Sequence, residues 1–241
     1  MTGLDLQAGR MELSPLGTEA LDTPALDRRI ARATLRDIAQ ANRLFGGHAA
    51  VVYGVKQLLD GARHPGPLTV ADVGAGGGDV LVALERMLMH RGIRTLGVAL
   101  DWHREAAAMA REHRQLALVA DAFGLPLADR SADIVVASQL LHHCSRDAAV
   151  RLIQMLDRVA RIGVVIADLR RSHVAAWGIG LAATLLRFHP VSRADGMISV
   201  RRGYSRAELA EVCHRAGVDA TVGRRPGYRL VAYWRCDRED R

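Results

Sequence analysis

Short apolar runs alternate with amphipathic segments through the middle of this chain, and this alternation constrains the fold more than any other feature. Five runs have the length of buried strands: Thr69–Val73, Thr95–Leu100, Leu116–Ala120, Ala132–Ala137 and Gly163–Ala167. Segments with helical periodicity separate several of them: Val80–His90, Arg104–His113 and Asp147–Arg161. Such alternation favours a parallel sheet with helices on both faces, so the sequence predicts an α/β fold.

The C-terminal part adds a helix and two strands to this pattern. The helix is predicted at Ser205–Ala216, with Ser205 as its N-cap and Gly217 just past its end. Strands are predicted at Ala220–Arg224 and Tyr228–Arg235, which brings the total to seven.

Two other segments surround this core. Helical periodicity over Leu26–Gly61, broken near Gly46 and Gly47, predicts an N-terminal cap of two helices at 25–64. About 35 residues follow the fifth strand: an apolar segment, Val174–Phe188, and then a basic, loop-like one. We predict a flexible tail at 1–24 and a single domain at 25–241, with its catalytic core at 65–235 and a lid insertion at 173–203.

Composition excludes several classes of function. The chain has 241 residues, of which 49% are hydrophobic, enough for one full-sized domain. It lacks the roughly 18 to 20 unbroken apolar residues of a membrane span. The net charge of +7 comes from scattered arginines, and aromatic residues make up 4%, which disfavours a nucleic-acid partner. An odd count of 3 cysteines without CxxC spacing favours a reducing, cytoplasmic location.

A glycine-rich stretch, VADVGAGGGD at Val70–Asp79, follows the first strand of the core. Ligands bind at the carboxyl ends of parallel strands, where glycine lets the backbone approach them. A P-loop would need Lys-Ser/Thr after the glycines, and a GxGxxG dinucleotide turn would need glycine where Asp79 stands. The stretch does match acid-x-Gly-x-Gly-x-Gly, beginning at Asp72.

With this pattern the chain resembles the class I S-adenosylmethionine (SAM)-dependent methyltransferases. GVALD, LVADAF, ADIVVASQLLHHC and YSRAELAEVCHRAG extend the resemblance in order, over about Leu68 to Arg235. It implies a Rossmann-like, seven-stranded methyltransferase sheet with helices on both faces, and SAM as the cofactor. The LHH of ADIVVASQLLHHC is typical of the small-molecule group related to ubiquinone and menaquinone biosynthesis.

The resemblance also implies which residues hold the cofactor. Asp101 corresponds to the acceptor for the ribose hydroxyls, Trp102 to the apolar residue on the adenine, and Asp121 to the partner of the adenine amino group. The expected cofactor-binding residues are Asp72, Gly74, Ala75, Gly76, Asp101, Trp102, Asp121, Ala122, Phe123 and Ser138. Three of these residues have a structural alternative: Asp101 as a helix cap, Asp121 as a turn residue, and Trp102 as a core residue.

The segment after the fourth strand bears on the acceptor. Ser138-Gln139-Leu140-Leu141 differs from the Asp/Asn-Pro-Pro-aromatic motif of enzymes that methylate nucleic-acid bases, and no acid stands at Ser138 to hold magnesium, so we expect no metal. A neutral imidazole suits removal of a proton from an oxygen acceptor. We expect His142 to face the acceptor as the base and His143 to make a structural hydrogen bond, while a purely structural role for both stays open.

The predicted function is therefore methyl transfer to a small, largely apolar acceptor, most simply the oxygen of a phenolic or polyketide-like metabolite. Transfer to nitrogen or carbon, a SAM-binding protein without activity, and a dinucleotide oxidoreductase are the alternatives. The protein is expected to be a monomer or a homodimer.

Overall fold

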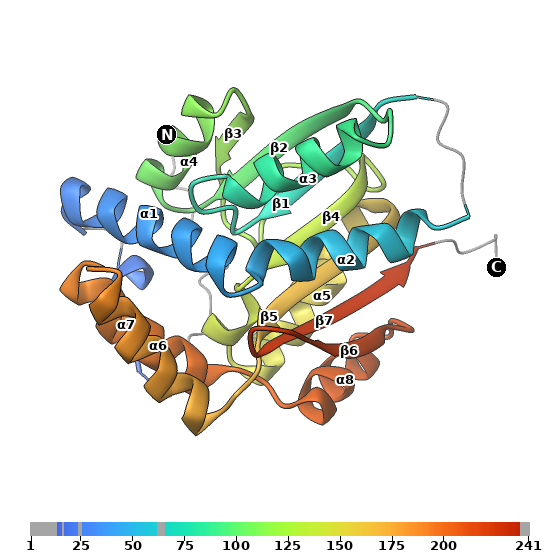
Figure 1. Ribbon diagram of the computed structural model, residues 1–241. Coiled ribbons are helices and arrows are strands. Elements are labelled where there is room, and N and C mark those ends of the chain that lie inside the picture. Colours follow the sequence, from blue (N-terminus) through green and yellow to red (C-terminus); the bar gives the residue numbers. More distant parts are fainter. Residues whose placement is uncertain (1–13, 16, 24–25, 62–65, 237–241) are drawn as a thin grey trace, which may run out of the picture.

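The computed structural model describes residues 14–15, 17–23, 26–61 and 66–236, and its centre is one seven-stranded sheet (Figure 1). The strands are β1 (Leu68–Val73), β2 (Thr95–Asp101), β3 (Leu116–Val119), β4 (Ala132–Ser138), β5 (Ala160–Leu169), β6 (Thr221–Arg225) and β7 (Arg229–Arg235). Their order is β3-β2-β1-β4-β5-β7-β6. The first five are parallel, and β7 runs antiparallel to both β5 and β6. This confirms the predicted methyltransferase sheet.

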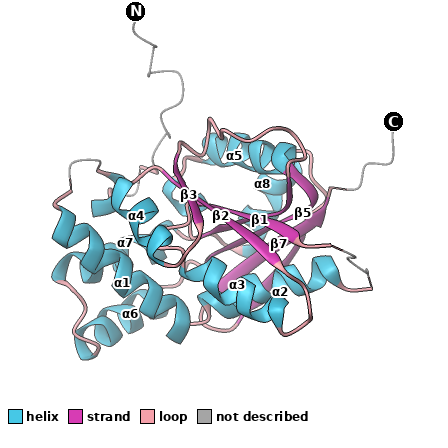
Figure 2. Cartoon of the chain, turned by 90° about the horizontal axis from the view of Figure 1, so that it is seen from above, coloured by secondary structure: helices cyan, strands magenta, loops and turns pink. Residues whose placement is uncertain are grey.

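Helices cover both faces of the sheet (Figure 2). One core cluster joins the sheet to α2 (Gly47–Leu59), α3 (Asp79–Met89) and α4 (Arg104–Glu112). The other joins it to α5 (Arg146–Val159) and α8 (Arg206–Arg215). Because side chains alternate along a strand, Val70 of β1 belongs to the first cluster and its neighbour Ala71 to the second.

The strand order reverses between β1 and β4, so the ligand crevice of the fold lies at the carboxyl ends of these strands. Beyond this edge lie α1 (Arg28–Leu44), α6 (His173–Leu185) and α7 (Pro190–Arg202), beside one another in Figure 1. A short 3₁₀ helix, η2 (Leu141–His143), follows β4 at the same edge. The fold therefore gathers the predicted site residues at one end of the sheet.

The N-terminal helical pair is only in part a cap. α1 and α2 meet at the predicted glycine pair, where Gly46 has φ +77°. However, α2 is a layer of the core, with Ala50, Val51 and Val55 fully buried. A Cβ on Gly54 would lie 2.4 Å from Val165 Cγ1 of β5, so the helix approaches the sheet closely. The predicted cap role applies to α1 alone.

The second half of the lid insertion is a helix, not the loop that the sequence suggested. α7 begins with Pro190 after His189, whose ring Nδ1 accepts a hydrogen bond from Val191 N at 3.3 Å. The polar and apolar residues of α7 follow no helical stripe, because the helix contacts α6, α1 and η2 on different sides. Periodicity alone therefore could not detect it.

The segment before α1 is also ordered where the structure describes it. A 3₁₀ helix, η1, spans Ala20–Asp22, and Glu19 is 8% exposed. The prediction of a flexible tail is therefore wrong for residues 17–23, because buried ion pairs hold Glu19 and Asp22. Residues 1–13, 16 and 24 lie outside the described part of the chain.

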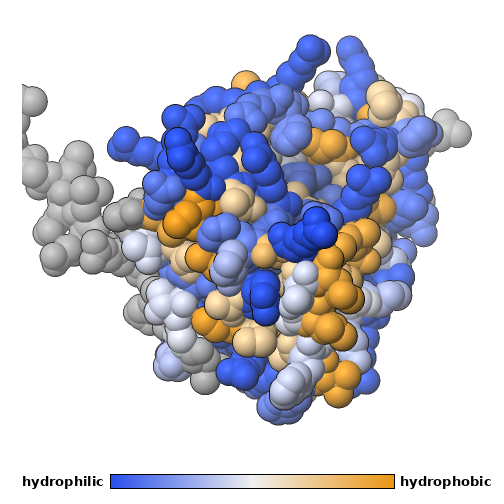
Figure 3. Space-filling model, turned by 60° about the vertical axis from the view of Figure 1, so that its left-hand side comes forward, coloured by the Kyte–Doolittle hydropathy of each residue, from blue (hydrophilic) through white to orange (hydrophobic). Residues whose placement is uncertain are grey.

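One side of α6 faces solvent with apolar side chains: Val174, Trp177, Leu181 and Leu185 are 64–83% exposed. Figure 3, which brings this end of the molecule forward, shows apolar side chains gathered among hydrophilic ones. Within the described residues, no helix combines the length and the apolar character needed to cross a membrane. All three cysteines are free and buried.

Candidate active site

A cavity of about 570 Å³ lies at the switch point of the sheet. The turn after β1, the ends of β2 and β4, α1 and the N-terminal segment form its walls. Every predicted cofactor-binding residue lines it except Phe123, whose side chain packs against the hydrophobic core instead. Phe123 is therefore the one predicted cofactor contact that does not line this cavity.

The glycine-rich turn bends through three residues with positive φ. These angles are +72° at Gly74, +53° at Gly76 and +81° at Gly78. A Cβ on Gly74 would lie 2.9 Å from Leu140 Cδ1, whereas one on Gly76 would meet only Leu35 at 3.6 Å. The glycines thus serve both the turn and the ligand: their backbone angles need glycine, and the bare backbone of Gly74 to Gly76 faces the cavity.

Three carboxylates surround this turn. Asp72 is fully buried, and neither of its side-chain oxygens has a hydrogen-bond partner in the described part of the chain. Burial, with the charges of Asp79 and Asp101 added, raises the pKa of Asp72 well above its usual value. Asp79 accepts hydrogen bonds from Asn42 Nδ2 at 3.1 Å and pairs with His48 Nε2 at 2.7 Å.

This environment fits SAM better than a dinucleotide. The buried, unpartnered carboxyl of Asp72 favours a ligand that carries positive charge and hydrogen-bond donors, and acids around the turn repel a pyrophosphate. SAM carries an ammonium and a sulfonium group, so the turn around Asp72 and Asp79 fits it.

Asp101 ties the end of β2 to the turn. Its Oδ2 accepts a hydrogen bond from Gly76 N and its Oδ1 one from His103 N, both at 2.8 Å. Burial raises the pKa of Asp101, although these two bonds oppose the shift. The N-cap of α4 is His103, not Asp101, and each Asp101 oxygen keeps a lone pair for a ligand hydroxyl.

Two more of the predicted cofactor-binding residues, Trp102 and Asp121, line the cavity in different ways. Trp102 is 40% exposed and lines the cavity, so it is no core residue. Asp121 accepts a hydrogen bond from Phe123 N at 2.9 Å, as a turn residue does, and also lines the cavity. Both geometries are compatible with contact to the adenine.

His142 is held between two carboxylates. Its ring Nδ1 lies 2.7 Å from Asp168 Oδ1, and its backbone N–H donates to Asp168 Oδ2 at 3.2 Å. Its Nε2, 3.5 Å from Glu19 Oε1, has no hydrogen-bond partner among the described residues. Burial lowers the pKa of His142, but Asp168 and Glu19 outweigh it and raise that pKa to about 10. The ordinary imidazole pKa assumed from the sequence does not apply here.

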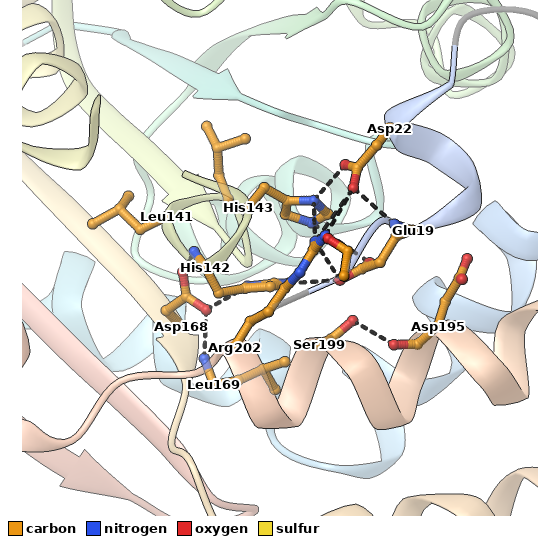
Figure 4. A network of polar contacts seen from close by, with 12 residues as sticks. Glu19, Asp22, Leu141, His142, His143, Asp168, Leu169, Asp195, Ser199 and Arg202 are labelled. Carbon is orange, nitrogen blue, oxygen red and sulfur yellow. Dashed lines mark hydrogen bonds and ion pairs between the residues drawn. The ribbon is translucent and has the colours of Figure 1, made fainter. Parts of the chain in front are cut away.

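His143 has a parallel arrangement. Its Nδ1 lies 2.7 Å from Asp22 Oδ1 and its Nε2 3.7 Å from Glu19 Oε2. Arg202 of α7 completes the cluster, with Nη1 3.1 Å from Glu19 Oε1 and Nη2 3.3 Å from Asp22 Oδ2 (Figure 4). Both histidines line the cavity, with ring centroids 4.3 Å apart. The expectation that only one would face it was wrong.

This cluster also brings together possible metal ligands. One ligand atom each from Glu19, His142 and His143 lies within 4.8 Å of the others. The sequence does not reveal this group, because Glu19 is far from the two histidines in the chain. The Arg202 guanidinium already neutralises the Glu19 carboxylate. A divalent cation would have to displace it, which supports the expectation of a metal-free site.

Four residues of the site escaped sequence reasoning as participants: Glu19, Asp22, Asp168 and Arg202. Asp168 lies in β5 just before its carboxyl end, so its place in the strand was a usable signal. The other three come from segments whose packing the sequence pattern does not reveal.

A second cavity, of about 380 Å³, adjoins the first. α1, α6, α7 and the start of β7 form its largely apolar walls. Five residues line both cavities: Glu19, Leu21, Ile38, Gln139 and Ser199. The predicted lid insertion thus encloses a space beside the histidine cluster.

Comparison with known proteins agrees with this geometry. Residues 71–167 match the family model described as "Methyltransferase domain". No curated protein matches the chain in sequence. Three solved structures illustrate the likeness of fold.

A SAM-dependent methyltransferase from Aquifex aeolicus has 19% identity and a TM-score of 0.59, with 87% of this chain and 98% of that one covered. A putative O-methyltransferase from Nostoc punctiforme has 18% identity and a TM-score of 0.60, over 92% and 64%. The O-methyltransferase NcsB1 from neocarzinostatin biosynthesis has 21% identity and a TM-score of 0.59, over 86% and 58%.

The sheet order and the position of the ligand crevice are those of the Rossmann-like methyltransferase fold. Residues 71–167 therefore carry a methyltransferase domain, and the fold is that of the SAM-dependent methyltransferases.

Proposed function

We propose that this enzyme transfers the methyl group of SAM to a hydroxyl oxygen of a small, largely apolar acceptor of phenolic or polyketide-like character. The observation that carries the proposal is the His142–Asp168 pair. His142 lines the cofactor cavity next to Glu19, a residue shared with the second cavity. An oxygen acceptor must lose a proton, and an oriented imidazole is the side chain that most often removes one.

The second cavity supports an apolar acceptor. Its walls include Ile38, Phe45, Leu169, Ile179, Phe188 and Val200. Its volume of about 380 Å³ suits a molecule of one or two rings. An acceptor there would reach the cofactor cavity past Gln139 and Ser199, which line both spaces.

His142 would act through Nε2, the ring nitrogen without a hydrogen-bond partner. Asp168 orients the ring by holding Nδ1. Bound SAM supplies an electrophilic methyl group on a sulfonium and leaves as S-adenosylhomocysteine. As the acceptor oxygen forms its new bond to the methyl carbon, its proton passes to Nε2 of His142. Because the pKa of His142 is about 10, its neutral form is scarce near pH 7 but strongly basic.

The alternatives make different demands on the site. A protein that binds SAM without activity would fill the space over Ser138 with side chains. Ser138 instead lines the open cavity, and its hydroxyl has no partner among the described residues. Methyl transfer to nitrogen or carbon stays the second candidate, since a base beside the acceptor also serves those reactions.

The test is the mass of the product. The full-length enzyme is incubated with SAM and a panel of phenols, naphthols, aromatic amines and catechols, and the products are analysed by mass spectrometry. A gain of one methyl on naphthols or phenols, placed on oxygen by fragmentation, is the expected result. Methylation confined to the amines or to ring carbons would overturn the proposed oxygen specificity. The proposed setting is cytoplasmic small-molecule biosynthesis.

A further inference from the structure

Arg229 is a buried cation with no assigned role. It begins β7, opposite Leu169 near the carboxyl end of β5, and its residue is 4% exposed. Its Nε donates to the carbonyl of Phe45 at 3.3 Å, but its Nη1 has no hydrogen-bond partner among the described residues. No ion pair of Arg229 occurs in the described part of the chain. Arginine is seldom buried in this way without an anion beside it.

The side chain borders the second cavity, together with its neighbour Tyr228. Another orphaned polar atom, the hydroxyl of Thr34, lies on a residue that lines the same cavity from α1. The residues that carry these two unpartnered groups thus border a space that is otherwise largely apolar. Such a cavity recognises an apolar molecule that carries hydrogen-bond acceptors.

The carboxylates that line this cavity are already engaged elsewhere. Asp37 accepts hydrogen bonds from His189 N at 2.8 Å and from Ser192 Oγ at 2.7 Å. Asp195 accepts one from Ala20 N at 3.0 Å, and Glu19 pairs with Arg202. None of the described acids lies within ion-pair distance of Arg229. Burial lowers the pKa of Arg229 to about 10, and the charge of Asp168 opposes this shift. The guanidinium remains charged at neutral pH and still lacks a counter-ion.

We infer that the methyl acceptor carries a carboxylate, which pairs with Arg229 in the second cavity, while its hydroxyl lies toward His142. The inference rests on the proposed function, because it takes the second cavity as the acceptor site. The acceptor class is thus narrowed to hydroxylated, largely apolar carboxylic acids. A charge-assisted hydrogen bond in an apolar cavity is strong enough to set the orientation of such a molecule.

A matched pair of probes tests this pairing without any methyl transfer. The full-length protein is saturated with S-adenosylhomocysteine, and the binding of 2-naphthoate and of 2-naphthol is measured by calorimetry at pH 7. We expect 2-naphthoate to bind at least about tenfold more tightly, as charge-assisted pairing implies. Arg229→Gln should abolish this preference.

Arg225→Gln is the control. Arg225 lies opposite Arg229 in the β6–β7 pair but stacks on Tyr53, outside both cavities. Its loss removes the same charge from the same hairpin and should leave the preference intact. Equal binding of the two probes to the wild type, or a preference that survives in Arg229→Gln, would overturn the inference.

Two further measurements separate the other outcomes. If Arg229→Gln fails to fold, Arg229→Lys retains the charge and should keep a reduced preference for 2-naphthoate; its complete loss in a folded Lys variant contradicts charge pairing. If the preference depends on Arg229 but no hydroxylated naphthoic acid is methylated, the carboxylate site stands and the proposed function fails. If naphthols are methylated and the preference is absent, the proposed function stands alone.

Discussion

At the glycine-rich turn the carboxylate of Asp72 is buried without a partner among the described residues, whereas beside α7 the carboxylates of Glu19 and Asp22 each contact a cation. The first arrangement leaves negative charge for a cationic cofactor to neutralise. The second holds two histidines in place through ion pairs within the protein. At one end of the cavity a bound ligand would supply the positive charge that the carboxylate lacks. At the other end, side chains of the protein supply it.

The two ends also differ in how the chain builds them. One strand–turn–helix unit, from Asp72 to Asp79, supplies much of the cofactor end, and the ends of the neighbouring strands supply the rest. The histidine end draws on η1, η2, β5 and α7, which are far apart in sequence. The substitutions below test this contrast, from the largest expected effect to the smallest.

Replacement of His142 should have the largest effect. If Nε2 takes the proton of the acceptor, His142→Ala lowers kcat by roughly 10²–10⁴ and leaves SAM affinity unchanged, since the ring is absent from the cofactor end. Steady-state kinetics and calorimetry measure the two quantities. The loss should shrink for acidic phenols, which arrive already ionised. His143→Ala, the control, should mainly lower stability, and normal turnover by His142→Ala would remove the base assignment.

The pH dependence of kcat should follow the neutral form of His142. With a pKa of about 10, kcat is expected to rise up to that pH, by roughly tenfold per unit for a single-proton titration. Groups that face the ring are Asp168, Glu19 and His143, with Arg202 beyond them. Glu19→Gln removes a carboxylate that raises the pKa, so it should move the rise to lower pH. Glu211→Gln, which changes an exposed residue of α8, is the control and should leave the rise at the same pH. A kcat that falls between pH 7 and 9 would contradict the base role.

The same pKa affects stability in a defined direction. The pKa of His142 is higher in the folded protein than its unfolded value of 6.5. Its ion pairs therefore stabilise the fold fully below pH 6.5, and this contribution is lost as pH rises through about 10. Urea unfolding at a series of pH values should show the decline, and it should be smaller in His142→Gln.

Removal of acids at the two ends should change the stability in opposite directions. Asp22→Ala removes one of the two carboxylate partners of His143 and of Arg202, which keep only Glu19, and should cost up to about 3–5 kcal/mol in the free energy of unfolding. Asp72→Asn removes a buried charge that has no partner and should stabilise the cofactor-free protein by about 1–3 kcal/mol. Urea unfolding without SAM measures both. Destabilisation by Asp72→Asn would show that its carboxylate has a structural partner.

Loss of Asp101 should weaken the cofactor by a smaller amount. Asp101→Ala is expected to cost roughly 1.5–3 kcal/mol of SAM affinity, as for a hydrogen bond that involves a charged group. Calorimetry with S-adenosylhomocysteine gives the same comparison without turnover. Because Asp101 also holds Gly76 N, Asp101→Asn serves as the control that keeps one acceptor for this bond. Unchanged affinity in Asp101→Ala would remove the residue from the site.

Removal of metal should have the smallest effect of all. Activity is expected to survive EDTA, because Arg202 already neutralises the one carboxylate among the three clustered ligands. Assay of the dialysed enzyme with and without added zinc or magnesium measures this. Loss of activity that zinc restores would identify Glu19, His142 and His143 as a metal site and would replace the base mechanism.

Most of the fold and most of the cofactor end followed from the sequence. The five parallel strands are largely apolar runs, and the turn at Gly74 to Gly78 needs backbone angles that favour glycine. These are local constraints, so neighbouring residues reveal them. The chain continues from α5 into β5 at Ala160 without a loop, so the predicted helix end was two residues too late and the predicted strand start three residues too late.

What the sequence by itself determined, then, is the sheet, its switch point and the carboxylates around the glycine turn. Tertiary structure alone decided the histidine end. Glu19 looked like part of a tail and Arg202 like part of a loop, yet buried charges stabilise one another only when distant segments meet. The raised pKa of His142 has the same origin, because a pKa responds to charges that are near in space, wherever they lie along the chain.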